Sequence, residues 1–221
     1  VLGGGVLGIE AADALRRLNV KTTIIQRADR LMNKELDEKG SAILRKYLEG
    51  LGIKVITGAS VAKVFGNARV EQVELSNGDL LDAEIYIACA GVKANSELAA
   101  AAGLEVKRGV MVDAAMRTSD PDIFAAGDVA ELSGAVSGLW AVGTAQAAVA
   151  AATLFGKDAS YSPPSTLVSL KMDGIDVKGF GNLELGDGIE EIFDANEPEN
   201  EHRRLFISDG RIVGAVFVGP P

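Results

Sequence analysis

A glycine-rich turn at the start of the chain constrains the fold more than any other feature. The run Gly3-Gly4-Gly5-Val6-Leu7-Gly8 follows two apolar residues and fits G-x-G-x-x-G at its first, third and last glycines. In dinucleotide-binding folds this pattern joins the first strand of a parallel sheet to the next helix. Gly3 permits the tight turn, Gly5 lets backbone approach a pyrophosphate, and Gly8 lets the helix sit close to the strand. The free N–H groups at the helix start would then hold the phosphates.

The strand that feeds this turn is unusually short. Strands of this kind commonly have about five residues, and only Val1 and Leu2 precede the turn. We therefore expect the chain to be a fragment of a longer enzyme whose missing part lies upstream. The chain also stops at Pro221, directly after an expected hairpin, so we expect its last domain to be incomplete.

The first half of the sequence reads as alternating strands and helices. Hydrophobic spacing and turn residues predict helices over 6–19 and 36–51, and strands over 20–26, 53–57, 61–65, 70–75, 80–83 and 84–90. The strands over 61–83 form a meander with a tight turn at Asn77-Gly78. This order predicts an α/β fold: a Rossmann-like, doubly wound domain with a three-stranded β-meander excursion.

The second half follows a different pattern. We expect a short helix over 97–102, strands over 110–113 and 123–126, and a buried helix over 139–155. The segment 161–164 has linker composition. Beyond it we expect strands over 167–172 and 177–182, and a hairpin of 204–208 with 211–218 around Asp209-Gly210.

Composition excludes several classes of partner. The formal net charge is −9 and the sequence pI is about 4.7, whereas a nucleic-acid-binding protein needs basic patches. Cys89 is the only cysteine, so the chain holds no disulfide framework and no cysteine-rich metal site. No signal peptide and no uninterrupted apolar run long enough for a membrane span is present. We expect a cytoplasmic protein that binds neither nucleic acid, membrane nor metal.

The end of the second strand bears on the choice of nucleotide. NAD-preferring folds usually have an acidic residue there that accepts hydrogen bonds from the ribose, and this chain has Gln26. A neutral amide does not repel a 2′-phosphate, and Arg27 and Arg30 could supply positive charge. This favours NADPH. The competing reading is that both arginines are solvated and either cofactor binds, and the nearby carboxylate of Asp29 favours that reading.

A second motif lies at residues 118–128. The apolar segment 123–126 ends in Gly127-Asp128, which places one carboxylate at the carboxyl edge of a sheet, where ligands bind. Such a carboxylate can accept hydrogen bonds from a polyol, although Gly-Asp at a strand end is as often a helix cap or a turn.

Together, residues 3–10, 89–95 and 118–128 resemble the FAD- and NAD(P)-dependent pyridine nucleotide–disulfide oxidoreductase family. The chain is most similar to its single-flavin branch, which includes rubredoxin and ferredoxin reductases, nitrite reductase, NADH oxidases and coenzyme A disulfide reductase. The resemblance implies an NAD(P)-binding domain over 1–95 and the second segment of an FAD-binding domain over 96–160. It also implies a small, incomplete α+β C-terminal domain of the dimerisation type over 163–221.

The resemblance further implies roles for single residues. Asp128, after Gly127, would bind the flavin ribityl chain; Glu10 would lie near the nicotinamide; and Gly91 would line the NAD(P) cleft. A helix beginning near Leu139 would direct its positive end toward the flavin pyrimidine. The N-terminal FAD segment is missing, so the chain would hold only half a flavin site. The family's usual proline near residue 94 and its C-terminal His-Glu pair are also absent.

The expected activity is transfer of a hydride from NAD(P)H to FAD, and of electrons from there to an unknown acceptor. The acceptor could be a redox protein, a disulfide, oxygen or a nitrite-reducing module. We expect the chain to supply cofactor-binding residues and no catalytic acid or base. A homodimer is one possible oligomeric state. Two alternatives stand: a non-catalytic NAD(P)-sensing module and a flavin-free dehydrogenase. Three conspicuous side chains receive structural readings: His202 as a surface residue, and Cys89 and Trp140 as packed ones.

Overall fold

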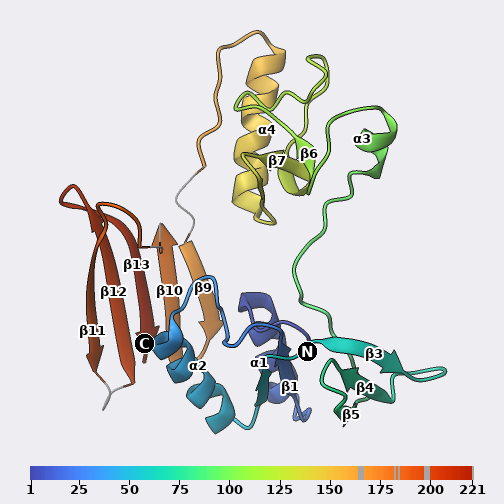
Figure 1. Cartoon of the computed structure of the whole chain (residues 1–221), viewed down its shortest axis with the longest axis vertical. Coiled ribbons are helices and arrows are strands. Elements are labelled where there is room, and N and C mark those ends of the chain that lie inside the picture. Colours follow the sequence, from blue (N-terminus) through green and yellow to red (C-terminus); the bar gives the residue numbers. More distant parts are fainter. Residues whose placement is uncertain (164–166, 182, 184, 197–199, 221) are drawn as a thin grey trace. The chain divides into compact units, whose positions relative to one another are not determined.

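The computed structural model describes residues 1–163, 167–181, 183, 185–196 and 200–220. The chain divides into two compact units (Figure 1). The first contains residues 1–90 together with 165–221, and the second contains residues 91–164.

The first unit is built around a short parallel sheet. Strands β1 (Thr23–Gln26) and β2 (Lys54–Thr57) pair in parallel. Leu2 forms parallel bridges to Ile25 on one side and to Ala88 on the other, so the order across the sheet is β2, β1, Leu2 and Ala88. The expected strand over 84–90 is wrong, because the only ladder partner of this segment among the described residues is the single residue Leu2.

Helices and a meander complete this α/β part. Helix α1 (Val6–Arg17) follows the glycine turn, and α2 (Glu38–Gly50) precedes β2. The expected excursion is confirmed as an antiparallel three-stranded sheet in the order β3 (Val61–Phe65), β4 (Gln72–Leu75) and β5 (Leu80–Asp82). Its buried residues Val73 and Leu75 pack with Ile25 of the parallel sheet in one small core.

A five-stranded antiparallel sheet forms the rest of the first unit. Its order is β11 (Glu190–Asn196), β12 (Glu201–Ser208), β13 (Arg211–Gly219), β10 (Ile175–Gly181) and β9 (Leu167–Met172). The expected hairpin around Asp209-Gly210 is confirmed, and both turn residues have positive φ. Strand β10 ends at Gly181, and the expected last residue of that strand, Asn182, lies outside the described residues.

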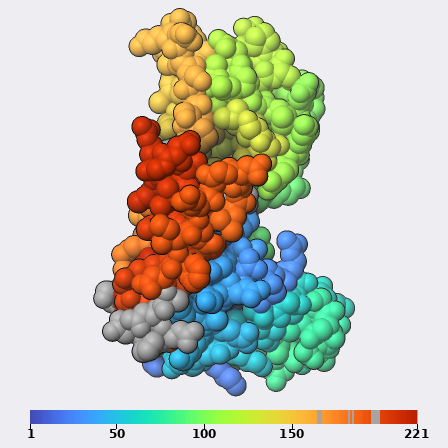
Figure 2. Space-filling view, turned by 60° about the vertical axis from the view of Figure 1, so that its left-hand side comes forward, coloured from blue at the N-terminus to red at the C-terminus, as the bar shows by residue number. Residues whose placement is uncertain are grey.

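Helices α1 and α2 pack against this sheet, α1 on β9 and α2 on β12 and β13 (Figure 1). In the space-filling view the orange and red residues of the sheet lie directly against blue residues of the N-terminal part (Figure 2). Alternate residues of the sheet point at the helices and join one hydrophobic core with them: Ile9, Ala12, Leu44, Leu48, Leu170, Val177, Phe206, Val216 and Val218. In the first unit, helices α1 and α2 therefore pack against both the parallel sheet and the C-terminal sheet. Its hydrophobic core crosses from the Rossmann-like part into the C-terminal sheet.

The second unit is smaller and less regular. It contains α3 (Glu97–Ala101), a sheet of β6 (Val110–Met111), β7 (Ala130–Leu132) and β8 (Ala135–Val136), a 3₁₀ turn η1 (Gly127–Val129) and α4 (Trp140–Leu154). Its core combines Val112 and Met116 with Ala130, Val142 and Tyr161.

Several expectations for this unit are wrong. Residues 123–126 are not a buried strand, because one bridge between Arg117 and Phe124 closes a short hairpin around Asp120-Pro121 and no ladder continues it. Helix α4 is not buried all round: Trp140 at its start is 91% exposed, which also overturns its reading as a packed residue. Tyr161, placed in a linker by composition, is buried in the core, and Pro164 lies outside the described residues.

Candidate functional site

The glycine turn is as tight as its spacing predicts. Gly3 has φ +115°, and a Cβ there would lie 2.3 Å from the carbonyl oxygen of Cys89. A Cβ on Gly8 would lie 1.9 Å from the carbonyl oxygen of Gly3. Both positions therefore need glycine, the first for backbone conformation and close approach, the second for contact between α1 and the turn.

Gly4 and Gly5 are glycines for different reasons. A Cβ on Gly4 would come within 2.6 Å of the Leu31 side chain, so this position is closed by packing. A Cβ on Gly5 would meet no atom within 4 Å, so the space beside Gly5 is open. Helix α1 begins at Val6 with no side-chain cap and no acidic residue in its first turn. Its first N–H groups, including that of Leu7, have no intrahelical acceptor and are available to an anion.

The side chain of Gln26 reaches the same turn from the end of β1. Its Oε1 accepts a hydrogen bond from the Gly4 N–H at 3.0 Å, and its Nε2 donates to Asn33 Oδ1 at 3.1 Å. Arg27, the next residue, is exposed and forms no ion pair with any described residue. The structure therefore brings the glycine turn, Gln26 and the backbone of Arg27 into one place, at the edge where parallel strands end.

Glu10 lies on α1 and faces the C-terminal sheet. Its Oε1 accepts a hydrogen bond from the backbone N–H of Lys171 in β9 at 2.9 Å. An open groove of about 460 Å³ runs alongside and is lined by Glu10, Asp13, Ala14, Arg17, Lys171, Met172 and Asp173. The carboxylate of Glu10 is thus oriented by backbone from a strand far along the chain, a partner that the motif does not reveal.

Cys89 is half-buried beside the glycine turn. A Cβ on Gly8 would lie 3.5 Å from the Cys89 Cβ, so the cysteine packs against the turn. Gly91, two residues later, is exposed and has φ +98°, a conformation that L-residues rarely adopt. Gly91 belongs to the second unit.

Gly127 and Asp128 lie at the start of η1, against α4. Gly127 has φ +81°, and its N–H donates to Gln146 Oε1 at 2.7 Å. A Cβ on Gly143 would lie 3.3 Å from the Gly127 Cα, so two glycines allow close contact between turn and helix. The carboxylate of Asp128 is exposed and forms no hydrogen bond or ion pair with a described residue. Gln146, which is 4% exposed, was missed because nothing in an alanine-rich helix marks it.

A buried carboxylate supports the same unit. Glu131 in β7 is 2% exposed, and its Oε2 accepts hydrogen bonds from the N–H groups of Arg108 at 2.7 Å and Gly109 at 2.9 Å. These bonds fix the loop before β6 to the strand that follows Asp128. Sequence gave no sign of this role, because the acceptor and the donors lie more than twenty residues apart.

His202 is buried and not on the surface. It is 1% exposed, and its Nε2 lies 2.9 Å from Oδ2 of Asp37, the N-cap of α2. Burial raises the pKa of Asp37, but the Gly40 N–H, His202 and Arg204 outweigh it and hold that pKa below its ordinary value. An ionised Asp37 only accepts, so the Nε2 of His202 carries the proton and donates. Its Nδ1 has no partner among the described residues.

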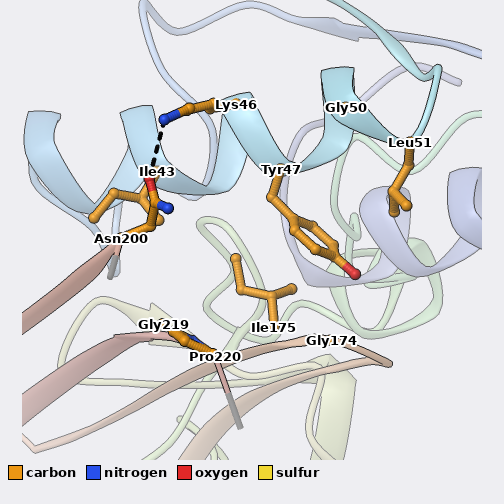
Figure 3. Close-up of a pocket in the computed structure, with 10 residues that line it drawn as sticks. All are labelled: Ile43, Lys46, Tyr47, Gly50, Leu51, Gly174, Ile175, Asn200, Gly219 and Pro220. Atoms are coloured by element: carbon orange, nitrogen blue, oxygen red, sulfur yellow. Dashed lines mark hydrogen bonds between the residues drawn. The ribbon is translucent and has the colours of Figure 1, made fainter. Parts of the chain in front are cut away.

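A further cavity of about 420 Å³ lies between α2 and the C-terminal sheet (Figure 3). Tyr47 projects from the helix toward the β9–β10 turn, where its hydroxyl donates to the carbonyl oxygen of Asp173. At the other end Lys46 Nζ donates to Asn200 Oδ1 at 3.1 Å. None of the residues predicted to bind nucleotides lines this cavity.

These features define an α/β protein with the glycine turn typical of dinucleotide-binding folds, and with a second glycine-acid turn beside an uncapped helix. No helix in the described part is long and apolar enough to cross a membrane. The described residues also contain no cluster of three or more side chains suited to a metal ion.

Comparison with known proteins defines the family. The family model for pyridine nucleotide-disulphide oxidoreductases matches residues 1–152, and that for the rubredoxin NAD+ reductase C-terminal domain matches residues 164–220. The chain therefore belongs to the pyridine nucleotide-disulphide oxidoreductase family, and its fold is that of a Rossmann-like FAD/NAD(P)-binding protein with a C-terminal antiparallel sheet.

Three relatives illustrate the match. The nitrite reductase large subunit of Klebsiella oxytoca is 34% identical over 99% of this chain and 23% of its own length. The NADH-rubredoxin oxidoreductase of Clostridium acetobutylicum is 31% identical over 99% of this chain and 54% of its own. The crystal structure of an FAD-dependent oxidoreductase of the same family from Desulfovibrio vulgaris has TM-score 0.81 at 29% identity, over 99% and 58%. The chain thus spans between 23% and 58% of the length of these relatives.

Proposed function

We propose that this chain supplies the NAD(P)H site and part of the FAD site of a flavin-dependent oxidoreductase. In this proposal residues 1–95 bind NAD(P)H, residues 96–160 contribute to FAD binding, and residues 163–221 form the C-terminal domain. Bound FAD would supply the redox chemistry, accepting hydride from the nicotinamide and delivering electrons to an acceptor. The chain's own residues bind and orient the cofactors.

The observation that carries this proposal is the glycine turn with its open side. Gly3, Gly4 and Gly8 are closed by neighbouring atoms, whereas the space at Gly5 is free. Uncapped N–H groups of α1 lie beside that space, and no acidic side chain in the first turn competes for them. A pyrophosphate fits this arrangement because it needs several converging N–H donors and a close approach to backbone.

The ribose end of the site favours NADPH over NADH. A carboxylate at the position of Gln26 would repel a 2′-phosphate, but the amide does not. Arg27 is exposed and unpaired within the described chain, so its guanidinium is available to a phosphate. The carboxylate of Asp29 does not remove this charge, because its partner is Arg30, at 3.1 Å.

The second unit fits an elongated polar ligand such as the ribityl chain. Asp128 offers a free carboxylate beside Gly127, whose conformation is held by Gln146. The uncapped N-terminus of α4, with no acidic residue in its first turn, lies against the same 3₁₀ turn. In the same proposal Glu10 lies near the nicotinamide and Gly91 lines the NAD(P) cleft. The acceptor is a redox protein, a disulfide, oxygen or a nitrite-reducing module.

Calorimetric titration of the chain with NADPH, NADH and FAD in parallel tests the proposal. We expect NADPH to bind more tightly than NADH. Arg27→Ala should weaken NADPH binding about tenfold or more and leave NADH unchanged, since a hydrogen bond to a charged group contributes about 1.5–3 kcal/mol. Asp128→Asn serves as the matched control, because it lies outside the proposed NAD(P)H site. Binding of neither nicotinamide nucleotide would contradict the proposal.

A further inference from the structure

We propose that Arg30 is a positioning residue that shapes the loop 27–36 for any adenosine ribose, and that Arg27 alone reads the 2′-phosphate. This inference rests on the proposed function, since it concerns the ribose end of the same site. It separates two arginines that are three residues apart and look equivalent in the sequence.

The guanidinium of Arg30 is already committed to the loop. Its Nε donates to the carbonyl oxygen of Leu36 at 3.0 Å, and one terminal nitrogen donates to the carbonyl oxygen of Asn33 at 3.3 Å. The other terminal nitrogen contacts the Asp29 carboxylate at 3.1 Å. The side chain is 32% exposed, so these bonds are partly shielded from water. Turning toward a phosphate would leave two backbone carbonyls without this donor.

The loop that Arg30 holds is joined to the glycine turn through both backbone groups of Gly4, directly at Met32 and by way of the Gln26 side chain. The Gly4 N–H donates to Gln26 Oε1, and the Gly4 carbonyl accepts from the Met32 N–H at 2.8 Å. The Gln26 Nε2 in turn donates to Asn33 Oδ1 and, at 3.3 Å, to the carbonyl oxygen of Arg30. The amide of Gln26 is therefore fixed between the turn and the loop.

The loop also needs support because its backbone is strained. Met32 has φ +44° and is 1% exposed, an uncommon conformation for a long side chain. A left-handed residue persists where its surroundings hold it. The hydrogen bonds from the Arg30 guanidinium to the carbonyl oxygens of Asn33 and Leu36 hold the backbone that follows Met32. Losing them should displace Asn33 and so remove the hydrogen bond that Asn33 accepts from Gln26.

Arginine suits this task and lysine does not. The guanidinium is a planar fork with donors fixed in several directions, whereas an ammonium is a point charge on a flexible stem. Arg30→Lys keeps the positive charge near the ribose site but cannot reproduce the paired bonds to the two carbonyls. If Arg30 served only as a cation for phosphate, the lysine variant would retain most of its function.

The test measures two ligands that differ by the 2′-phosphate: adenosine 2′,5′-bisphosphate and adenosine 5′-monophosphate. The full chain and its Arg30→Ala, Arg30→Lys and Arg27→Ala variants are titrated with each by calorimetry. Both Arg30 variants should lose about fivefold or more in affinity for both ligands by a similar factor, the equivalent of about one lost hydrogen bond. Arg27→Ala should lose about tenfold for the bisphosphate only.

Three results would overturn the inference. These are a loss confined to the bisphosphate in Arg30→Ala, wild-type affinity for both ligands in Arg30→Lys, or no change in either variant. Circular dichroism checks that each variant is folded; if Arg30→Ala unfolds, Arg30→Lys decides. Failure of the unaltered chain to bind NADPH, NADH and both adenosine ligands would instead refute the proposed function, and the inference with it.

Discussion

Replacing Asp37 by alanine tests how the C-terminal sheet is joined to the nucleotide-binding part. Asp37 Oδ1 accepts from the Gly40 N–H at 2.9 Å and caps α2, while Oδ2 lies 2.9 Å from Nε2 of the buried His202. Arg204 Nε lies 3.6 Å from the same oxygen. One carboxylate thus caps the start of a helix and accepts a hydrogen bond from a buried imidazole, which belongs to a strand 165 residues away.

Both losses add to the expected cost of Asp37→Ala. Removing an N-cap costs about 1 kcal/mol, and leaving a buried polar group without a partner costs about 1–3 kcal/mol. We expect the free energy of unfolding to fall by about 2–4 kcal/mol in urea unfolding at pH 7. Asp37→Asn keeps a capping oxygen and should lose less. Glu38→Ala, in the first turn of the same helix, controls for charge near the helix start.

The destabilisation should depend on pH with a definite sign. The pKa of Asp37 is lowered in the folded chain, so its stabilising contribution is complete above the ordinary value of 3.8 and is lost as the pH falls toward the folded value. The difference in the free energy of unfolding between the parent and Asp37→Ala should therefore shrink as the pH falls below about 4. A loss at pH 7 no larger than that of Glu38→Ala, or a difference that grows as the pH falls below about 4, would refute this reasoning.

Three further outcomes follow from single contacts. Gly8→Ala places a methyl group where only 1.9 Å separates it from the Gly3 carbonyl oxygen, so NADPH titration should show no binding. Glu131→Ala leaves two N–H groups without their acceptor and should lower the free energy of unfolding by about 3 kcal/mol or more in urea unfolding. Trp140→Ala should change that free energy by less than about 0.5 kcal/mol, because the side chain is 91% exposed; a larger loss would show that it packs.

Local patterns predicted much of the fold. The glycine turn, the helices that begin near Val6 and Glu38, the meander and the Asp209-Gly210 hairpin all depend on spacing or turn residues within a few positions. Their boundaries shifted by one to three residues, as expected when hydrogen bonds and not hydrophobicity end an element. The positions of Gln26 and Arg27 beside the turn also followed from strand order alone.

The errors concern contacts between distant segments. His202 lies among acidic and basic residues and looks solvated, but its strand faces α2, so its side chain is buried against Asp37. The apolar residues 84–90 and 123–126 looked like strands, yet each finds a single bridge and no ladder. Trp140 looked like a core residue because apolar residues surround it in sequence, but it lies on the exposed side of α4. Hydrophobicity indicates which segments can be buried. Which of them are buried depends on the segments that pack against them in the fold.

The residues proposed to select the nucleotide depend on the C-terminal sheet for their position. The loop 27–36 is bonded to the glycine turn through the Met32 N–H. It is also bonded to α2, where the buried Ser41 Oγ accepts a hydrogen bond from the Leu31 N–H at 3.0 Å. The start of α2 is in turn held by Asp37 and His202. Together these bonds join the ribose end of the site to strand β12. A glycine motif and an arginine are therefore insufficient to define specificity: the loop that presents the arginine takes its shape from residues that the motif does not contain.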